Sequence, residues 1–428
     1  MKRIIYIIAL FVSVAHFSYA QGEVEALNYS RNGLYGTARA MGMGNAFGAL
    51  GGDLTGVSIN PAGIGVYRSS EIVGTLGFMS NSSEVGDTKE SKSDFNVHNL
   101  GFVGYFPLRN ETMPMINFGF THNRQKSFNS NIRAAGYGAS TMIDYIADRS
   151  FGVDPGKLTI NDDKNAPDPF YDQPWLTVLG YNSWLINPRE SGKDIIYDPV
   201  NTKGETPFQQ INSYQRGYID QYDFTIGTTI NNVLNVGVAI NIADIYTLGN
   251  EITVNASGVG AKFGLIYRPV NAIRLGLAYH TPMIYNFSER FSADMADDMG
   301  AYVTDPEYKP GRTDSKIYTN YYDLKTPGKV VLSGAAVLGN NFIVSADYEM
   351  IDYGTMRLKV PGGNLNRSWY DIDNDYIKSD FKLTSNLRLG MEYRFTQQFS
   401  GRLGYAWMQN PYENDLKDAG KAAVAGSN

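Results

Sequence analysis

Alternation of apolar and polar residues is the feature that most constrains how this chain folds. The segment 381–395 shows it most clearly. Its even positions are mostly charged or small, whereas its odd positions are mostly apolar: Phe381, Leu383, Ser385, Leu387, Leu389, Met391, Tyr393 and Phe395. Successive side chains of a β-strand point to opposite faces, so the pattern predicts a strand with one apolar and one polar face. The same period recurs near 219–230, 272–280, 340–350 and 399–407. An all-β fold follows, and a soluble sandwich would show the same alternation.

The lengths of the connections separate a barrel from a sandwich. We count eleven strands, near 70–80, 95–107, 113–124, 219–230, 233–245, 256–268, 272–288, 328–338, 340–356, 381–395 and 399–409. Connections of a few residues alternate with long polar ones, the largest spanning about 125–218. Short turns at one rim and long loops at the other are typical of outer-membrane proteins. The sequence therefore predicts a transmembrane antiparallel β-barrel over 69–410, with long extracellular loops.

Composition excludes several other classes of protein. After residue 20 no stretch approaches 18 consecutive apolar residues, and the mean hydropathy is -0.28, which argues against a bundle of transmembrane helices. The formal net charge of -6 argues against a nucleic-acid partner. Residues 1–20 combine Lys2 and Arg3, an apolar run and small residues before Gln21, which predicts a cleaved secretory signal peptide. An exported protein without cysteine uses no disulfides.

The number of strands and the C-terminal tail do not fit a closed barrel. An odd count cannot close an up-and-down bacterial barrel of even strand number. Residues 411–428 are a tail that ends in small residues, and by parity they belong to an extracellular loop. We therefore expect that the last strands of the barrel are missing from this sequence.

A segment rich in small residues lies between the signal peptide and the first strand. It contains Gly42, Gly44 and Gly48 and ends in Asn60, Pro61 and Ala62. The spacing of its glycines is not that of a nucleotide-binding loop, and no strand precedes them. Met41, Met43, Phe47 and Leu50 among the glycines favour a compact hatch over 21–68 that plugs the lumen, rather than a flexible linker. We expect Asn60 and Pro61 to form a rigid turn that anchors it.

These features resemble the FadL family of outer-membrane transporters for fatty acids and aromatic hydrocarbons. The resemblance rests on the hatch of about forty residues ending in Asn-Pro-Ala, and on Thr326-Pro327 followed by two strands, the second with Ser345-Ala346-Asp347-Tyr348. It covers residues 36–409. The resemblance implies a barrel of about 14 strands, of which about 11 are present here. It also implies capture of a hydrophobic ligand by outer loops and passage through a lateral opening at a kinked strand.

The longest loop offers a candidate surface for ligand capture. Its apolar residues are Trp175, Leu176, Val178, Leu179, Trp184, Leu185 and Ile186. Long loops without a function are uncommon, so these side chains either bind the ligand or form the core of the loop itself.

Basic residues on the polar faces of strands are candidates for binding a ligand carboxylate. They are Arg274, Lys382, Arg388, Arg394 and Arg402. The alternative is ion pairing with lumen acids such as Asp223, Asp347, Glu349 and Glu392. On the third strand His122, Arg124 and Lys126 follow an apolar outward register, which predicts either a rim facing lipopolysaccharide or the kinked strand of the lateral exit.

No catalytic or metal-binding motif is present, and we expect neither an enzyme nor a cofactor. Three histidines remain after the signal peptide, on separate strands, and there is no HExxH or GxSxG motif. The sequence predicts a monomeric protein of the Gram-negative outer membrane that transports hydrophobic small molecules by passive diffusion past the hatch. Its partners would be that ligand, membrane lipid and lipopolysaccharide. The alternatives are a barrel of the same superfamily that serves the surface or secretion without transport, and an adhesin-like or haem-binding receptor.

Overall fold

The computed structural model describes residues 22–85, 88–138, 141–161, 166–200, 208–296, 311–339, 341–362 and 370–413. The predicted signal peptide and residues 414–428 of the predicted tail lie outside these ranges. No helix among the described residues is both long enough and apolar enough to span a membrane.

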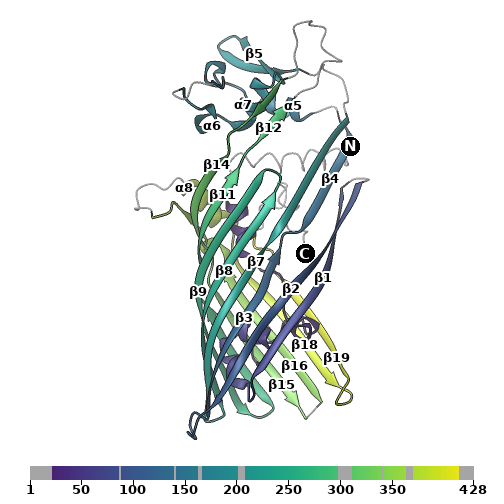
Figure 1. The fold of residues 1–428 in the computed structure, drawn as a ribbon, viewed down its shortest axis with the longest axis vertical. Helices are drawn as coiled ribbons and strands as arrows, with labels where there is room; N and C mark the ends of the chain where they lie inside the picture. Colours follow the sequence, from purple (N-terminus) through teal and green to yellow (C-terminus); the bar gives the residue numbers. More distant parts are fainter. Residues whose placement is uncertain are drawn as a thin grey trace.

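The fold is dominated by one large antiparallel sheet that curves around the N-terminal segment (Figure 1). Its main path follows chain order through β1 (Glu71–Val85), β2 (Thr88–Pro107), β3 (Met115–Ser127), β7 (Phe208–Ile230), β8 (Leu234–Gly249), β9 (Ile252–Val270), β10 (Ile273–His280), β15 (Lys329–Leu338), β16 (Phe342–Asp352), β18 (Leu383–Arg394) and β19 (Ser400–Met408). Each of the eleven predicted strands corresponds to one of these. Within the described residues, β1 and β19 are the two edges of the sheet and do not pair with each other.

Several strands of the sheet are interrupted in their upper parts. The predicted strand 272–288 is split into β10 and β11 (Ile284–Phe291), and its neighbour into β14 (Tyr318–Lys325) and β15. Pro282 and Pro327 lie in the two gaps, where a proline cannot donate a ladder hydrogen bond. The ladder is completed by Thr326, whose Oγ1 accepts from the Met283 N–H at 3.0 Å. Above β16, the short helix η4 (Tyr353–Thr355) leads to β17 (Arg357–Lys359), which pairs with β14.

The predicted loop 125–218 is shorter than expected, because strand continues into both of its ends. β3 runs to Ser127, β4 (Ser130–Tyr137) continues it after two residues, and β7 already begins at Phe208. β4 pairs with the upper part of β7. The strand ends were predicted from where the alternation of apolar residues stops, and these extensions lie beyond that point.

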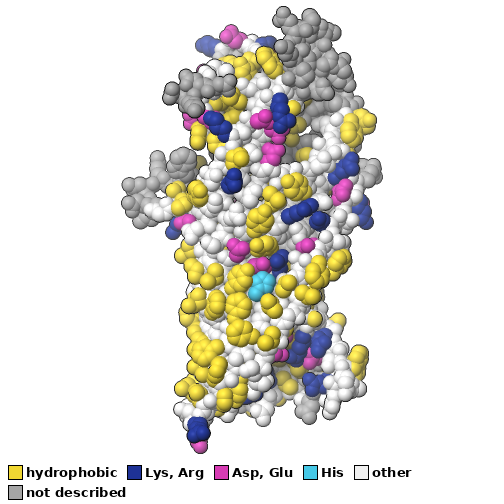
Figure 2. All heavy atoms as spheres, in the orientation of Figure 1, with side chains coloured by type: hydrophobic (Ala, Val, Ile, Leu, Met, Phe, Trp, Pro, Cys, Tyr) yellow, Lys and Arg dark blue, Asp and Glu magenta, His cyan; other side chains and the backbone are white. Residues whose placement is uncertain are grey.

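The alternation places an apolar belt on the outside of the sheet. Ile273, Leu275, Leu277 and Tyr279 of β10 are all 44–51% exposed, although they are large and apolar. Comparable residues on the neighbouring strands include Val238, Ile240, Phe263, Leu265, Leu332, Leu389 and Met391. Figure 2 shows the belt as a broad apolar area over the lower part of the wall. A contiguous exposed apolar surface of this kind is expected where hydrocarbon, not water, surrounds the protein.

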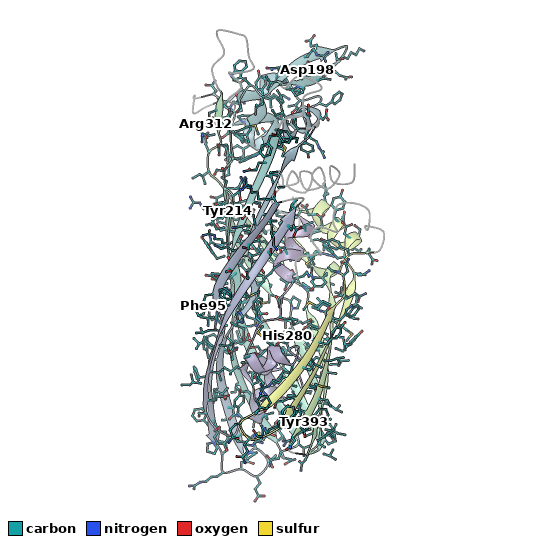
Figure 3. All side chains as sticks on the ribbon, turned by 90° about the vertical axis from the view of Figure 1, so that its right-hand side faces the viewer. Phe95, Asp198, Tyr214, His280, Arg312 and Tyr393 are labelled. Carbon is teal, nitrogen blue, oxygen red and sulfur yellow. The ribbon has the colours of Figure 1, made fainter. Side chains whose placement is uncertain are left out.

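The N-terminal segment lies inside the curved sheet. It contains α2 (Glu23–Ser30), α3 (Ala38–Gly42), α4 (Leu54–Ile59) and the 3-10 helix η2 (Pro61–Val66). α2 lies in the upper part of the lumen and the other helices below it (Figures 1 and 3). Ala40, Met43, Phe47, Leu54 and Ile64 are each at most 1% exposed, so the segment is packed and is not a linker.

A separate cap stands above the barrel (Figure 1). It contains α5 (Met142–Arg149), η3 (Pro155–Lys157), α6 (Pro169–Asp172), α7 (Trp175–Asn182) and two hairpins. The hairpins are β5 (Ile186–Ser191) with β6 (Asp194–Pro199), and β12 (Asp294–Ala296) with β13 (Arg312–Asp314). The remaining helix, α8 (Asp371–Asp380), precedes β18.

Candidate functional site in the lumen

Glycines of the wall let the backbone of the hatch approach the strands directly. A Cβ atom at Gly264 of β9 would overlap the Asn60 side chain, and one at Gly276 of β10 would lie 2.7 Å from the Gly48 carbonyl oxygen. Gly237, Gly390 and Gly404 on β8, β18 and β19 face the hatch backbone in the same way. Because any larger residue would displace the hatch, these positions hold it against both sides of the barrel.

Polar side chains of the wall satisfy backbone groups of the hatch. The Asp347 carboxylate accepts from the Phe47 and Gly48 N–H groups, both at 3.0 Å. Asn117 Nδ2 donates to the Ile64 carbonyl at 2.7 Å. Hydrogen bonds to a charged group are stronger than neutral ones, so Asp347 is a principal anchor of the hatch.

The Asn60-Pro61-Ala62 sequence forms the expected turn. Asn60 Oδ1 accepts from the Ala62 N–H at 3.1 Å, and Pro61 occupies the first position of η2. Asn60 Nδ2 donates to the carbonyls of Gly48 at 2.8 Å and Leu265 at 3.1 Å. The turn is therefore tied both to the rest of the hatch and to strand β9.

The three hatch glycines named from the sequence lie against the wall. Gly44 has a φ of +60° and its Cβ position is 2.9 Å from the Tyr405 backbone of β19. Gly48 packs against Ser333, and Gly42 lies beside Arg402.

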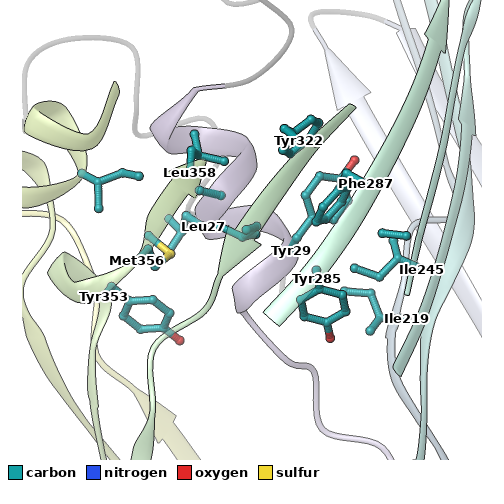
Figure 4. Close-up of a cluster of buried hydrophobic side chains, with 14 of the residues drawn as sticks. Leu27, Tyr29, Ile219, Ile245, Tyr285, Phe287, Tyr322, Tyr353, Met356 and Leu358 are labelled. Carbon is teal, nitrogen blue, oxygen red and sulfur yellow. The ribbon is translucent and has the colours of Figure 1, made fainter. Parts of the chain in front are cut away.

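The upper lumen is an apolar chamber, which α2 fills. Leu27 and Tyr29 of α2 pack among aromatic side chains from several strands (Figure 4). The Tyr29 ring lies 5.0 Å from that of Phe287, which stacks on Tyr322 at 4.6 Å. Lys126 Nζ donates to the Asn28 carbonyl at 2.7 Å. The helix thus fills this part of the lumen with apolar side chains.

A buried cavity of about 140 Å³ lies between α2 and the lower hatch. Its charged lining residues are Arg31, Lys262, Lys329, Glu349 and Arg388, and His280 of the wall also lines it. Figure 3 shows His280 beside the lower hatch helices. Four of these residues are cations, and three carboxylates stand beside them, since Asp223 pairs with Lys262 and Asp347 lies opposite Arg388 in addition to Glu349. The cavity therefore suits an anionic or polar group better than a cation.

Ion pairs organise the cations of this cavity. Arg388 Nη2 and Lys329 Nζ both contact Glu349 Oε2, at 2.8 and 3.2 Å. Lys262 Nζ lies 2.8 Å from Asp223 and also donates to the Ser58 carbonyl of the hatch at 2.9 Å. His280 Nε2 donates to the Ile59 carbonyl at 2.8 Å.

The structure divides the five predicted lumen cations. Arg388 lines the cavity, Arg402 pairs with Glu392 at 2.6 Å beside Arg39, and Arg274 donates to the Leu50 carbonyl. Lys382 and Arg394 lie at the two ends of β18 and do not line the cavity. The predicted ion pairing thus accounts for Arg388 and Arg402.

Three lining residues of the cavity were not predicted from the sequence: Lys262, Lys329 and His280. Each lies on the polar face of a strand whose opposite face is apolar, and this alternation was the available signal.

The wall is split between β2 and β3 at the height of the cavity. Their pairing ends at Asn99 and Asn123, and β3 contains a register shift between Arg124 and Lys126. Side chains bridge the split, because Arg124 Nη1 donates to Asn96 at 3.1 Å while its Nε pairs with Asp220 at 2.5 Å. Asn123 and Gln125 line the cavity on the inner side.

This irregularity corrects the expected direction of Lys126. His122 pairs with Asp220 at 3.2 Å among outward residues, but the register shift turns Lys126 toward α2 inside the barrel. The prediction that all three polar residues of β3 point outward was wrong for Lys126, since an inserted residue reverses the alternation beyond it.

The cap buries most of the proposed capture residues in its own core. Val178, Leu179, Leu185 and Ile186 are at most 7% exposed, and Trp175 and Leu176 pack on the same core. Trp175 donates its Nε1–H to the Phe170 carbonyl at 2.9 Å. Trp184 is the exception, with 63% exposure and a φ of +61°.

The carboxylate of Asp168 joins α6 to the strand β14. Burial works to raise the pKa of Asp168, but hydrogen bonds from Tyr318 and Lys316 outweigh it and hold the pKa below its ordinary value. The Tyr318 hydroxyl donates at 2.7 Å.

Among the described residues, no group of three or more His, Asp or Glu is placed to hold a metal ion.

Comparison with solved structures finds two monoaromatic hydrocarbon channels and a FadL homologue among the matches. The fold is similar to "CymD monoaromatic hydrocarbon channel" (14% identity, 88% of this chain and 85% of that chain, TM-score 0.45). It is also similar to a FadL homologue of Pseudomonas aeruginosa (10%, 90% and 82%, 0.46) and to a deletion mutant of the TodX monoaromatic hydrocarbon channel (12%, 90% and 86%, 0.47). No family model and no curated protein matches the sequence.

Proposed function

We propose that this chain is an outer-membrane protein that takes up hydrophobic small molecules by passive diffusion. The observation that carries this proposal is the cavity that reaches the split between β2 and β3, above the lower part of the hatch, which fills the straight route through the barrel. The apolar belt supports placement in the membrane, and the apolar upper chamber supports a hydrophobic ligand.

The charges in the cavity favour a ligand that carries a carboxylate, such as a fatty acid. Arg31, Lys329 and Arg388 line the cavity with Glu349, and Asp347 lies opposite Arg388, so three positive charges stand beside two carboxylates. A ligand carboxylate would complete this cluster with hydrogen bonds to charged groups, while its apolar tail would lie in the upper chamber.

The same contacts favour exit through the wall rather than past the hatch. Moving the lower hatch would break the bonds of Asp347 and Asn60 and separate backbone from glycine-lined strands. Widening the split requires movement of side chains such as Arg124 and Asn96, with no ladder hydrogen bonds to break above Asn99. We therefore assign the gating movement of the hatch to its first helix, α2.

Uptake by cells that express single variants tests the proposal. Arg388→Gln should reduce uptake of a labelled fatty acid about tenfold, since hydrogen bonds to charged groups contribute about 1.5 kcal/mol or more. Uptake of a neutral arene should change less than twofold. Lys382→Gln, immediately before the same strand and outside the cavity, is the matched control.

Two results would count against this function. Equal fatty-acid uptake by cells with and without the wild-type protein would refute the proposal that the protein is a transporter. Equal effects of the Arg388 and Lys382 variants would refute the proposal that the cavity binds a ligand carboxylate. Heat-modifiable mobility on gels checks that both variants keep the barrel fold.

A further inference from the structure

A group of basic side chains on the outer face of the barrel takes no part in the proposed transport. Lys325 of β14 and Arg357 and Lys359 of β17 form this basic patch. Their neighbours Leu324 and Leu358 are at most 1% exposed and point inward. Because side chains alternate along a strand, the three basic residues point outward.

The basic patch brings the like charges of Lys325 and Arg357 together, while Lys359 faces Asp323 across the same ladder. Lys325 and Arg357 are direct partners across the β14–β17 ladder, an arrangement that is destabilising by itself. Arg357 Nη1 donates to the carbonyls of Gly354 at 3.0 Å and Met356 at 2.6 Å, which holds the guanidinium against the wall.

Two nearby acids accept hydrogen bonds from neutral groups, and the charge of Asp323 stays opposite Lys359. Asp323, opposite Lys359, accepts from Asn286 at 2.7 Å, and Asp352 accepts from the Gly354 N–H at 3.1 Å. In the part of the chain that the structure describes, no ion pair joins the basic patch to a carboxylate. An external anion would relieve the repulsion within the patch.

The patch lies at the upper edge of the apolar belt. Lys325 is paired with Ile284, which is 53% exposed, and Leu277 and Tyr279 of β10 continue the belt below it. Above Ile284 the outward positions of β11 are the polar residues Asn286, Ser288 and Arg290. The change from apolar to polar residues marks the height of lipid headgroups in a membrane protein.

We propose that the basic patch binds the phosphate of a phosphorylated outer-leaflet glycolipid whose acyl chains lie along the belt below. This inference rests on the membrane placement in the proposed function. A phosphate accepts bidentate hydrogen bonds from an arginine and attracts a neighbouring lysine, which matches Arg357 beside Lys325. The acyl chains separate this ligand from free phosphate, because the belt residues contact them.

Lipid binding to purified full-length protein tests the inference. Lipid A is titrated into the detergent-solubilised protein and the bound fraction is measured by native mass spectrometry. The double variant Lys325→Gln/Arg357→Gln should bind about 25-fold more weakly, at about fivefold for each cation near a membrane surface. The control Arg312→Gln/Lys316→Gln removes two exposed cations from the cap and should stay within twofold of wild type.

Two further ligands identify the source of the anion. Lipid A without its phosphates should bind wild type as weakly as lipid A binds the double variant, and inorganic phosphate at equal concentration should not displace lipid A. Equal binding of both double variants, tight binding of dephosphorylated lipid, or displacement by inorganic phosphate would each overturn the inference. If the wild-type protein does not take up ligand but lipid A binds as expected, only the proposed transport function is refuted and the lipid inference stands.

Discussion

Replacing Gly264 by alanine should release the hatch without unfolding the wall. The added methyl would overlap Asn60 Oδ1 and lie 2.9 Å from the Ala62 nitrogen, so the Asn60 turn must move. The Asn60 side chain makes three hydrogen bonds, to Gly48, Leu265 and Ala62, each of which contributes about 1 kcal/mol. The docking free energy of the hatch should fall by about 3 kcal/mol, equivalent to about a 100-fold increase in its open population.

Hydrogen exchange measures this opening directly. The amides of Asn60 and Gly63 bond to carbonyls within the hatch, and in Gly264→Ala their exchange should accelerate about 100-fold. Gly334→Ala, on β15 of the same sheet, is the control, because its Cβ would meet nothing within 4 Å. Equal exchange rates in the two variants would refute the idea that wall glycines hold the hatch. Heat-modifiable mobility should remain that of wild type in both.

Three further predictions concern other parts of the chain. Asn60→Ala with Pro61→Ala should loosen the hatch and raise single-channel conductance, and conductance equal to wild type would contradict an anchoring role. Trp184→Gly should stabilise the end of α7 by about 1 kcal/mol, since Trp184 follows that helix at a φ of +61°, and slower exchange of α7 amides would show it. Burial raises the pKa of Glu25 to about 7. Docking of α2 should therefore be strongest below about pH 4.5 and weaken as pH rises through 7. Hydrogen exchange of the α2 amides measures this dependence on pH, and Glu25→Gln should abolish it.

The strands could be predicted because alternation is a local property of the sequence. Each predicted strand corresponds to a position in the sheet, and the outward belt on β10 and β18 follows the predicted register. The small residues before β1 likewise predicted a packed segment, and the turn at Asn60 and Pro61 depends on those residues and their immediate neighbours. Where an irregularity intervened, as at Arg124 on β3, the periodic prediction failed for Lys126.

The candidate site was decided by contacts between distant parts of the chain. Lys262 meets Ser58 of the hatch, and Arg388 and Lys329 meet at Glu349, only because the sheet curves around the N-terminal segment. The apolar run in the cap illustrates the same limit, since its sequence is compatible with a ligand surface and with a core. Alternation assigns a side chain to one face of a strand, whereas curvature and packing determine which side chains from other strands it meets on that face.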